Sequence, residues 1–379
     1  MGTPKLILRK NISDMKKNLV IVNANDPQLA NLIPYLNSLF CPDRGNFKGD
    51  VYVITTGMSE VVKNKLADLG AKIFENTLTE VLSSEFSLRI GAYEILKRKF
   101  NKRTTWKRIL KRTTSILFFR KLVESSILSM KNELNRMIEK AERDLSYRAV
   151  LEAEFELYHR KHFTKLNAIH LWKTIDVERY SSVLLTDADM IFQNDVSSIF
   201  KKIEESEYFV YEDESVPLLR CPQDQEGYIH LSSSHRLAEE TKYSKMLKFG
   251  DGFAECNVGV VGIKAARFME WILDWKSLMW DEEMNFLFTA HPKLFWHEQD
   301  FFRLQRDLHI SETTKFGKEL VYHAVGAMGY EIEEVDLNTF RTKSSKIEPT
   351  LVHFAGGSWK RFENINKEYS KNISELIKS

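Results

Sequence analysis

The sequence has few cysteines, and the three that it contains are far apart, at Cys41, Cys221 and Cys256. They match neither the spacing of a zinc site nor the even number of a disulfide framework, which fits a reducing compartment. The first residues lack the apolar core of a secretory signal, and no apolar run reaches the roughly 20 residues that cross a bilayer. The formal net charge is only +2, so nothing global indicates a nucleic acid partner. We therefore expect a cytoplasmic protein that is at most bound to a membrane surface.

Repeats and low-complexity segments are absent as well. The chain has 379 residues, of which 43% are hydrophobic, and this is enough for one large α/β domain. The N-terminal part alternates short apolar runs with helical patterns. The predicted strands and helices here are, in order, residues 18–23, 30–40, 50–55, 59–69 and 71–74, with Gly70 ending the second helix. Strands that alternate with helices are typical of a parallel sheet, whose ligands gather at the carboxyl ends of its strands.

The most informative stretch is SSVLLTDADMIFQNDVSSIF, residues 181–200. It predicts a buried strand over residues 183–185, a short apolar patch over 190–192, and a helix that begins after Asn194-Asp195. Successive side chains on a strand point to opposite faces, so Asp187 and Asp189, two residues apart, share a face. Two carboxylates on one face repel unless a positive charge lies between them, and a divalent metal that carries a phosphate is the usual solution. A turn rich in aspartate that only ends a strand is the alternative.

Later elements follow the same pattern. We expect a helix over residues 162–175, strands over 208–211, 258–263 and 351–354, a helix over 265–280 with an aromatic core-facing stripe, a helix start at 297–304, and an irregular stretch over 212–254.

Residues 93–160 interrupt this pattern as a predicted helical insert. Residues 97–121 hold eleven Lys or Arg and no Asp or Glu, interleaved with aromatic and aliphatic residues, and acidic residues return from Glu124 onwards. Either the acidic part folds back on the basic part, or the basic part is an amphipathic surface that binds anionic lipid.

Several stretches together resemble the glycogenin-like retaining glycosyltransferases, of the family 8 type with the GT-A fold. They are VIVNANDPQLANLIPYLNSL, VYVITTGMSEVVKNKLADLGAKIF, FTKLNAIHLW before SSVLLTDADMIFQNDVSSIF, and then CNVGVVGI, HEQDFF and LVHFAGGSWK. The resemblance implies a single Rossmann-like α/β domain over residues 12–360 with a mostly parallel central sheet, the basic helical insert at 93–160, and a C-terminal helical tail at 361–379.

The same resemblance implies roles for individual residues. The metal ligands would be Asp187, Asp189 and His353, for Mn²⁺ or alternatively Mg²⁺. The nucleotide sugar would contact Asn23, Asn25, Asp26, Lys165, Asp187, Ala188, Gly356 and Lys360. The catalytic group would comprise Lys165, Asn257, Gln299 and Asp300, with Glu298 as an alternative acid. Gln28 stands where the family has a tyrosine that stacks on uracil, and Lys360 lies one position later than the family's lysine.

The resemblance thus implies a metal-dependent retaining transferase that moves a sugar from a nucleotide diphosphate sugar, with UDP-linked donors favoured, to a hydroxyl acceptor. That acceptor is a glycan, a protein or a lipid-linked molecule. A homodimer is one option for its oligomeric state. Tyr228 and Tyr243 lie in the acceptor region, but nothing marks either as a site of self-glycosylation.

Two rival interpretations remain open. A phosphatase of the haloacid dehalogenase type would use Asp187 as its nucleophile, and Gly250-Asp251-Gly252 imitates its late motif. Three predicted strands precede Asp187, however, whereas that nucleophile strand normally opens its domain. A non-catalytic sugar-nucleotide-binding protein is the other alternative, although all three metal ligands are present.

Overall fold

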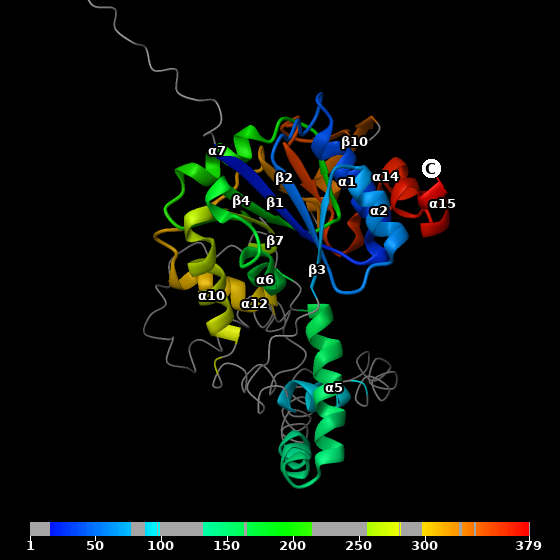
Figure 1. The fold of residues 1–379 in the computed structure, drawn as a ribbon. Helices are drawn as coiled ribbons and strands as arrows, with labels where there is room; N and C mark the ends of the chain where they lie inside the picture. The colour runs from blue at the N-terminus through cyan, green and yellow to red at the C-terminus, as the bar shows by residue number, and fades with distance from the viewer. Residues whose placement is uncertain are drawn as a thin grey trace, which may run out of the picture.

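The structure is a computed structural model, and it describes residues 16–76, 88–96, 98, 132–162, 165–213, 256–279, 281, 298–325, 328–336 and 339–378. Its centre is a seven-stranded sheet in the order β3-β2-β1-β4-β7-β6-β8 (Figure 1). The strands are β1 (Lys17–Asn23), β2 (Asp50–Thr55), β3 (Lys72–Glu75), β4 (Tyr180–Thr186), β6 (Phe209–Asp213), β7 (Cys256–Lys264) and β8 (Thr314–Lys315). Only β7 runs antiparallel to its neighbours. The predicted α/β architecture with a mostly parallel sheet is therefore confirmed.

The first three strands form the predicted βαβ units. A short 3₁₀ turn, η2 (Asp26–Gln28), leads from β1 into α1 (Leu29–Phe40), and α2 (Glu60–Asp68) connects β2 to β3. Gly70 follows α2 with a φ of +93°, a left-handed conformation that glycine adopts without steric cost, so it ends the helix as predicted. These crossovers leave the carboxyl ends of β1, β2 and β4 at one edge of the sheet.

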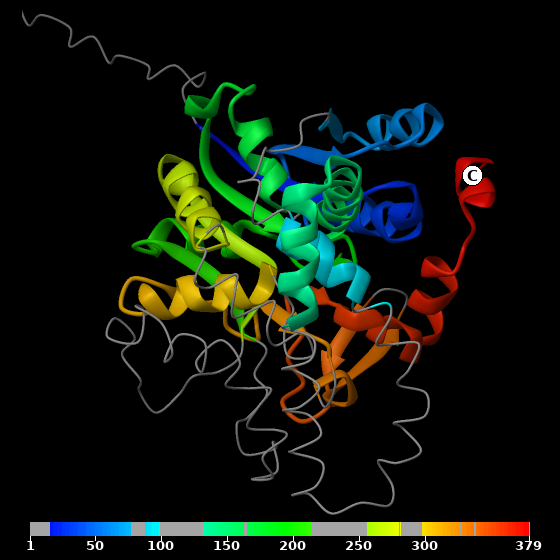
Figure 2. The same ribbon diagram turned by 90° about the horizontal axis from the view of Figure 1, so that it is seen from below.

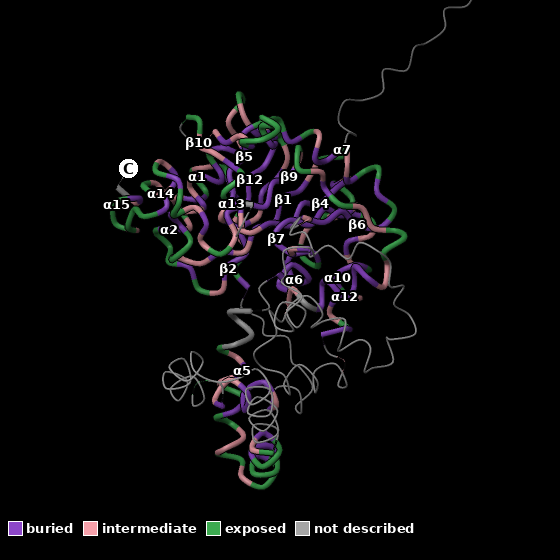
Figure 3. The backbone as a smooth tube through the Cα atoms, turned by 180° about the vertical axis from the view of Figure 1, so that it is seen from behind, coloured by how far each residue is buried: buried purple, intermediate pink, exposed green. Residues whose placement is uncertain are grey.

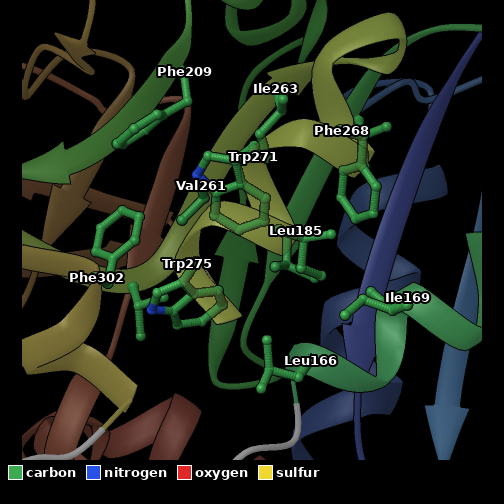
Figure 4. Close-up of a cluster of buried hydrophobic side chains, with 14 of the residues drawn as sticks. Leu166, Ile169, Leu185, Phe209, Val261, Ile263, Phe268, Trp271, Trp275 and Phe302 are labelled. Atoms are coloured by element: carbon green, nitrogen blue, oxygen red, sulfur yellow. The ribbon is translucent and has the colours of Figure 1, made fainter. Parts of the chain in front are cut away.

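Helices cover both faces of the sheet because side chains alternate along β1. Val20 and Val22 pack on one face against α1, α2 and α7 (Ser197–Glu205). Leu19 and Ile21 pack on the other face, where α6 (Ala168–Trp172), α10 (Phe268–Met279) and α12 (Glu298–Leu308) lie. Figure 4 shows Trp271 and Trp275 of α10 against the sheet, beside Phe302. The expected aromatic stripe of α10 is buried, which confirms its role in the core.

The helix expected over residues 162–175 is wrong in extent. The described chain has a 3₁₀ turn, η3 (Lys165–Asn167), and then α6, which ends at Trp172. The end of α6 has a local cause, because both the backbone N–H and the hydroxyl of Thr174 donate to the carbonyl oxygen of Leu171. Another 3₁₀ turn, η4 (Val177–Arg179), then leads into β4.

A second, three-stranded sheet lies beside the first, in the order β5-β12-β9. Its strands are β5 (Met190–Phe192), β9 (Val321–His323) and β12 (Leu351–His353), so it joins the segment after β4 to the C-terminal part of the chain. The remaining elements are η7 (Ala265–Arg267), α13 (Met328–Glu331), the hairpin of β10 (Ile332–Asp336) and β11 (Thr339–Thr342), η8 (Ala355–Arg361), α14 (Glu363–Tyr369) and α15 (Ile373–Lys378). The last two helices return to α1, and α15 also meets α2 (Figure 2).

The insert is a helical projection away from the sheet (Figure 1). Helical residues 88–96 and 132–143 pack with α5 (Leu145–His162) around a small core of their own, and the far end of the projection is largely exposed (Figure 3). Gly91 allows a close crossing, since a Cβ there would lie 1.9 Å from the carbonyl oxygen of Leu151. Of the basic residues 97–121, only Arg98 is described, and it forms an ion pair with Glu154.

One described ion pair, between Arg98 and Glu154, joins the basic part of the insert to its acidic part. The membrane contact of residues 97–121 and the proposed domain boundaries stay predictions. None of the helices in the described parts of the chain combines the length and the apolarity that spanning a bilayer requires.

Candidate functional site

Asp187 and Asp189 lie on the short link between β4 and β5, at the carboxyl edge of the parallel strands. Backbone hydrogen bonds hold both ends of this link. The N–H of Asp187 donates to the carbonyl of Gly259 at 2.9 Å, and the N–H of Phe354 donates to the carbonyl of Asp189 at 2.9 Å. The two side chains are 41% and 23% exposed, so both carboxylates are open to a ligand.

His353 reaches these carboxylates because β12 pairs antiparallel with β5, which places it directly opposite Met190. Its Nε2 lies 3.4 Å from Asp189 Oδ1 and 3.8 Å from Asp187 Oδ2. One ligand atom from each of the three residues lies within 4.8 Å of the others. The structure thus brings the three predicted metal ligands together, from two segments that are more than 160 residues apart. Two carboxylates and one imidazole form a donor set that suits Mn²⁺ and leaves room for phosphate oxygens.

Lys165 is buried beside this group. Its ammonium forms an ion pair with Asp187 Oδ1, and its backbone N–H donates to Glu298 Oε1 at 3.1 Å. Burial alone lowers the pKa of Lys165, but the negative charge of Asp187, to which the ammonium is bonded, outweighs burial and raises it. The buried ammonium therefore stays charged next to the predicted metal site.

The predicted acceptor-side residues come from α12 and β7. Glu298 lies at the start of α12, and its burial raises its pKa. The positive charge of Lys165 lowers this pKa and the negative charge of Asp187 raises it, so that the pKa is about 8. Gln299 follows on the same helix and is partly exposed. Asn257 lies on β7, where its Oδ1 accepts a hydrogen bond from the N–H of Gly259 at 2.6 Å. The side chain of Asp300 lies outside the described part of the chain.

The side chains of the predicted nucleoside residues Asn25 and Asp26 form hydrogen bonds within the protein. Asn25 Oδ1 accepts the hydroxyl of Thr55 at 2.8 Å and the N–H of Thr56 at 3.0 Å. Asp26 Oδ1 accepts the N–H of Ser59 at 2.9 Å, just before α2 begins. These bonds fix the shape of the turn after β1. Gln28 takes part as well, because its Oε1 accepts the backbone N–H of Asn25 at 2.9 Å.

Asn23 differs from its neighbours. Both polar atoms of its side chain are shielded from solvent, and neither has a hydrogen-bond partner among the described residues. It is the last residue of β1, and the register that pairs Val22 with Thr186 places Asn23 next to Asp187 across the two strands. An amide that lacks partners at this edge of the sheet has the hydrogen-bonding capacity that a polar ligand can use.

Gly356 and Gly357 follow β12 and form a left-handed pair, with φ values of 64° and 75°. Left-handed backbone of this kind directs successive N–H groups to one side, where they can bind an anion. The Lys360 Nζ lies 4.0 Å from the position that a Cβ of residue 357 would occupy. Lys360 therefore lies beside Gly357 although it stands one position later than in the family. Ala188, between the two aspartates, is buried.

Two buried side chains behind His353, those of Glu212 and His323, were not predicted from the sequence. Glu212 was expected in an irregular stretch, but it lies in β6, and its carboxylate accepts from His353 Nδ1 and from His323 Nδ1. Burial raises the pKa of Glu212. His353 and His323 outweigh burial through their charges and their hydrogen bonds, and they lower this pKa to about 2. The negative charge of Glu212 in turn outweighs the effect of burial on His353 and, with Asp189, raises the pKa of His353 well above its usual value. The sequence contains no local signal for this cluster.

Several other sequence-based expectations fall on residues outside the described ones. These are Tyr228 and Tyr243, the residues 250–252 that imitate the phosphatase motif, and most of the acceptor-facing part between β6 and α12. Their roles stay predictions.

Comparisons with known proteins give similarity in structure only. No family model and no curated protein sequence matches the chain. Among solved structures, the bifunctional glycosyltransferase WbbM matches 96% of this chain with a TM-score of 0.50 and 10% identity. This chain spans about half (51%) of WbbM.

Two further structures are less similar. The galactosyltransferase LgtC, solved with donor and acceptor sugar analogues, has a TM-score of 0.45 and 12% identity, over 95% of both chains. Mouse xyloside xylosyltransferase 1 has a TM-score of 0.43 and 9% identity, over 90% of this chain and 98% of its own. The match to WbbM shows that the chain has the fold of a glycosyltransferase, and at 10% identity it shows the fold alone.

Proposed function

We propose that this chain is a metal-dependent glycosyltransferase that moves a sugar from a nucleotide diphosphate sugar to a hydroxyl acceptor. The observation that carries the proposal is the convergence of Asp187, Asp189 and His353 beside the buried ammonium of Lys165. This group lies at the carboxyl edge of the parallel strands, where α/β sheets bind their ligands. The fold that the chain shares with WbbM, a glycosyltransferase, supports the same function.

The residues present fit a divalent cation. Asp187 and Asp189 would supply oxygen ligands, and His353 would supply Nε2, with Mn²⁺ or Mg²⁺ as the ion. When bound, such an ion neutralises the diphosphate and stabilises the charge that develops as the nucleoside diphosphate leaves.

The chain's own cations and amides complete the diphosphate site. Lys165 would contact the donor phosphate from the side of Asp187, with its ammonium held in place by that carboxylate and its backbone by Glu298. The N–H groups of Gly356 and Gly357 and the ammonium of Lys360 would bind other phosphate oxygens. The negative charge of the leaving group would then be surrounded by fixed donors that need no reorganisation during the reaction.

The nucleoside would lie over the turn after β1, with Asn25 and Asp26 shaping the turn and Ala188 beside it. Asn23, at the carboxyl end of β1, would lie beside the nucleoside, as the family resemblance implies. A uridine base follows from the family resemblance, and the donor is therefore proposed as UDP-linked. Asn257 and Gln299 would contact the transferred sugar and the acceptor.

We propose transfer with retention of configuration. A double displacement needs an ionised carboxylate at the anomeric carbon. Glu298, with a pKa of about 8 and its Oε1 bonded to the backbone of Lys165, is mostly protonated at neutral pH and is a poor nucleophile. We therefore favour attack from the face of the departing phosphate, which itself accepts the proton of the acceptor hydroxyl.

The test compares turnover of a panel of nucleotide sugars, with water or simple sugars as acceptors, in the presence and absence of EDTA. We expect EDTA and Asp189→Ala each to reduce turnover at least 100-fold. The exposed Asp43→Ala is the matched control and should behave as wild type. Full turnover in EDTA, or in Asp189→Ala, would contradict the metal-dependent mechanism. Thermal stabilisation by each nucleotide sugar with Mn²⁺ would identify the donor, because a ligand that binds only the native state raises its melting temperature.

A further inference from the structure

The side chain of Glu212 lies directly behind His353, on the side away from the two aspartates. It is fully buried, and its carboxylate accepts hydrogen bonds from two imidazoles. His353 Nδ1 lies 2.8 Å from Oε1 and 2.7 Å from Oε2, and His323 Nδ1 lies 2.7 Å from Oε1. His323 is itself only 4% exposed, so solvent does not compete for these bonds.

The fold builds this contact from three strands. β12 and β9 run parallel and in register, so that His353 and His323 stand side by side. Glu212 reaches them from β6 of the main sheet, after an irregularity in the pairing of β6 with β7: Tyr211 pairs with Val261, but Glu212 pairs with Asn257. Register shifts of this kind re-aim side chains, and here the shift accompanies the turn of Glu212 toward the second sheet.

The geometry is that of a hydrogen-bonded support rather than of a second metal site. Two ligands of one tetrahedral zinc lie about 3.3 Å apart, because each is about 2.0–2.1 Å from the ion. The nitrogen–oxygen distances of 2.7–2.8 Å are shorter and match charge-assisted hydrogen bonds. An ionised carboxylate only accepts, so the proton of each bond belongs to the imidazole.

We propose that Glu212 is a positioning residue that fixes the orientation and the tautomer of His353 for the metal. With Nδ1–H donating to Glu212, the neutral ring has its lone pair at Nε2, which is the nitrogen that faces Asp187 and Asp189. His323 is the second donor, which holds the Glu212 carboxylate in its place. This inference rests on the proposed metal site, and it adds a residue that acts on that site only through His353.

Glu212→Gln tests the proposal with little change in shape. Both carboxylate oxygens contact His353 Nδ1, so in either orientation the NH₂ group of Gln would face that nitrogen and weaken the support for His353. We expect Mn²⁺ affinity, measured by titration calorimetry and by electron paramagnetic resonance of free Mn²⁺, to fall by about 10- to 100-fold. The matched control is Asp213→Asn, the next residue of β6, which removes an ion pair with Lys315 and should leave Mn²⁺ affinity unchanged.

The tautomer gives a second readout that needs no variant. In protein labelled with ¹⁵N at histidine and loaded with diamagnetic Mg²⁺, His353 should show a protonated Nδ1 and an unprotonated Nε2. A protonated Nε2 with a bare Nδ1 in wild type would overturn the proposal, as would a folded Glu212→Gln variant with wild-type Mn²⁺ affinity. Two ions per chain, the second lost in His323→Phe, would overturn it in favour of a metal within the cluster.

The same titrations separate this proposal from the proposed function. If wild type binds Mn²⁺ and Asp189→Ala does not, the metal site stands, and the result for Glu212→Gln decides the role of Glu212 alone. If wild type binds neither Mn²⁺ nor Mg²⁺, the proposed function and the inference both fail.

Discussion

Gly259 lies so close to the imidazole of His353 that a Cβ at position 259 would be 2.2 Å from His353 Cε1. The carbonyl of the same glycine accepts the N–H of Asp187. One residue of β7 therefore contacts two of the three proposed metal ligands, and its lack of a side chain gives His353 the space for its ring.

Gly259→Ala should displace His353 and weaken metal binding. The new methyl group meets a buried ring rather than the flexible end of a side chain, so we expect at least a tenfold loss of Mn²⁺ affinity and a loss of about 1–3 kcal/mol in the free energy of unfolding. Titration calorimetry and thermal melting measure the two effects.

Gly262→Ala, on the same strand, is the matched control. A Cβ there would lie 2.4 Å from Ile203 Cγ1, so this variant should lose stability but keep Mn²⁺ affinity. Equal Mn²⁺ affinities in the two variants would show that the space at position 259 is not specific to the metal site.

Metal binding should strengthen as pH rises. Without metal, burial lowers the pKa of His353, but the charge of Glu212 and the bond to Asp189 outweigh burial, so the ring is protonated at neutral pH. A metal ion needs the neutral ring and must displace this proton. Below the raised pKa, the apparent affinity for Mn²⁺ should therefore increase about tenfold per pH unit, for one proton released.

Calorimetry at pH 7 in two buffers with different ionisation enthalpies counts that proton directly. The raised pKa also stabilises metal-free protein at pH values below about 6.5, and this contribution is lost as pH rises through the folded-state pKa. A Mn²⁺ affinity that does not vary with pH, and no proton release, would argue against His353 as a ligand.

Asn23→Ala should separate stability from donor binding. The Asn23 amide is shielded from solvent and has no partner in the described structure, a situation that typically costs about 1–3 kcal/mol. Its removal should leave the free energy of unfolding unchanged or increase it, while UDP or the donor binds at least fivefold more weakly.

Asn25→Ala provides the contrast for this experiment. Asn25 Oδ1 accepts from Thr55 and Thr56, so its loss should lower both stability and nucleotide affinity. Thermal melting with and without nucleotide measures both quantities in each variant. If Asn23→Ala lowers stability and leaves nucleotide affinity intact, Asn23 is a structural residue.

Gly357→Ala should weaken binding of the diphosphate. Residue 357 has a φ of 75°, where a side chain costs about 1–2 kcal/mol, and the nearest atom to a new Cβ is 3.8 Å away. The backbone would therefore change conformation and move its N–H groups from the phosphate, with an expected loss of about tenfold in UDP affinity. Gly70→Ala, at a φ of +93° after α2, carries similar strain away from the site and should change only stability. Calorimetric titration of both variants with UDP and Mn²⁺ decides whether the effect is local.

The sequence alone determined the parts of this protein that depend on local patterns. The runs at β1, β2 and β4 are apolar because both faces of their sheet are covered, and their ends are marked by polar residues. Asp187 and Asp189 could be predicted for that reason. The helix over residues 162–175 could not, because Thr174 ends it through bonds to Leu171 that helical periodicity does not reveal.

Only the tertiary structure determined which residues contact the proposed metal ligands from behind. His353 meets Asp189 because β12 pairs with β5, and it meets His323 because β12 also pairs with β9. Glu212 joins them through a shift in the register of β6 against β7. The pairing of β12 with β5 connects His353 to Met190, 163 positions apart, whereas the other two pairings connect residues 30 and 45 positions apart. All three are selected by the packing of whole sheets. A hydrophobic pattern of period two or 3.6 does not indicate which strands will pair. The contact of Glu212 and His323 with the site is therefore seen only in the folded chain.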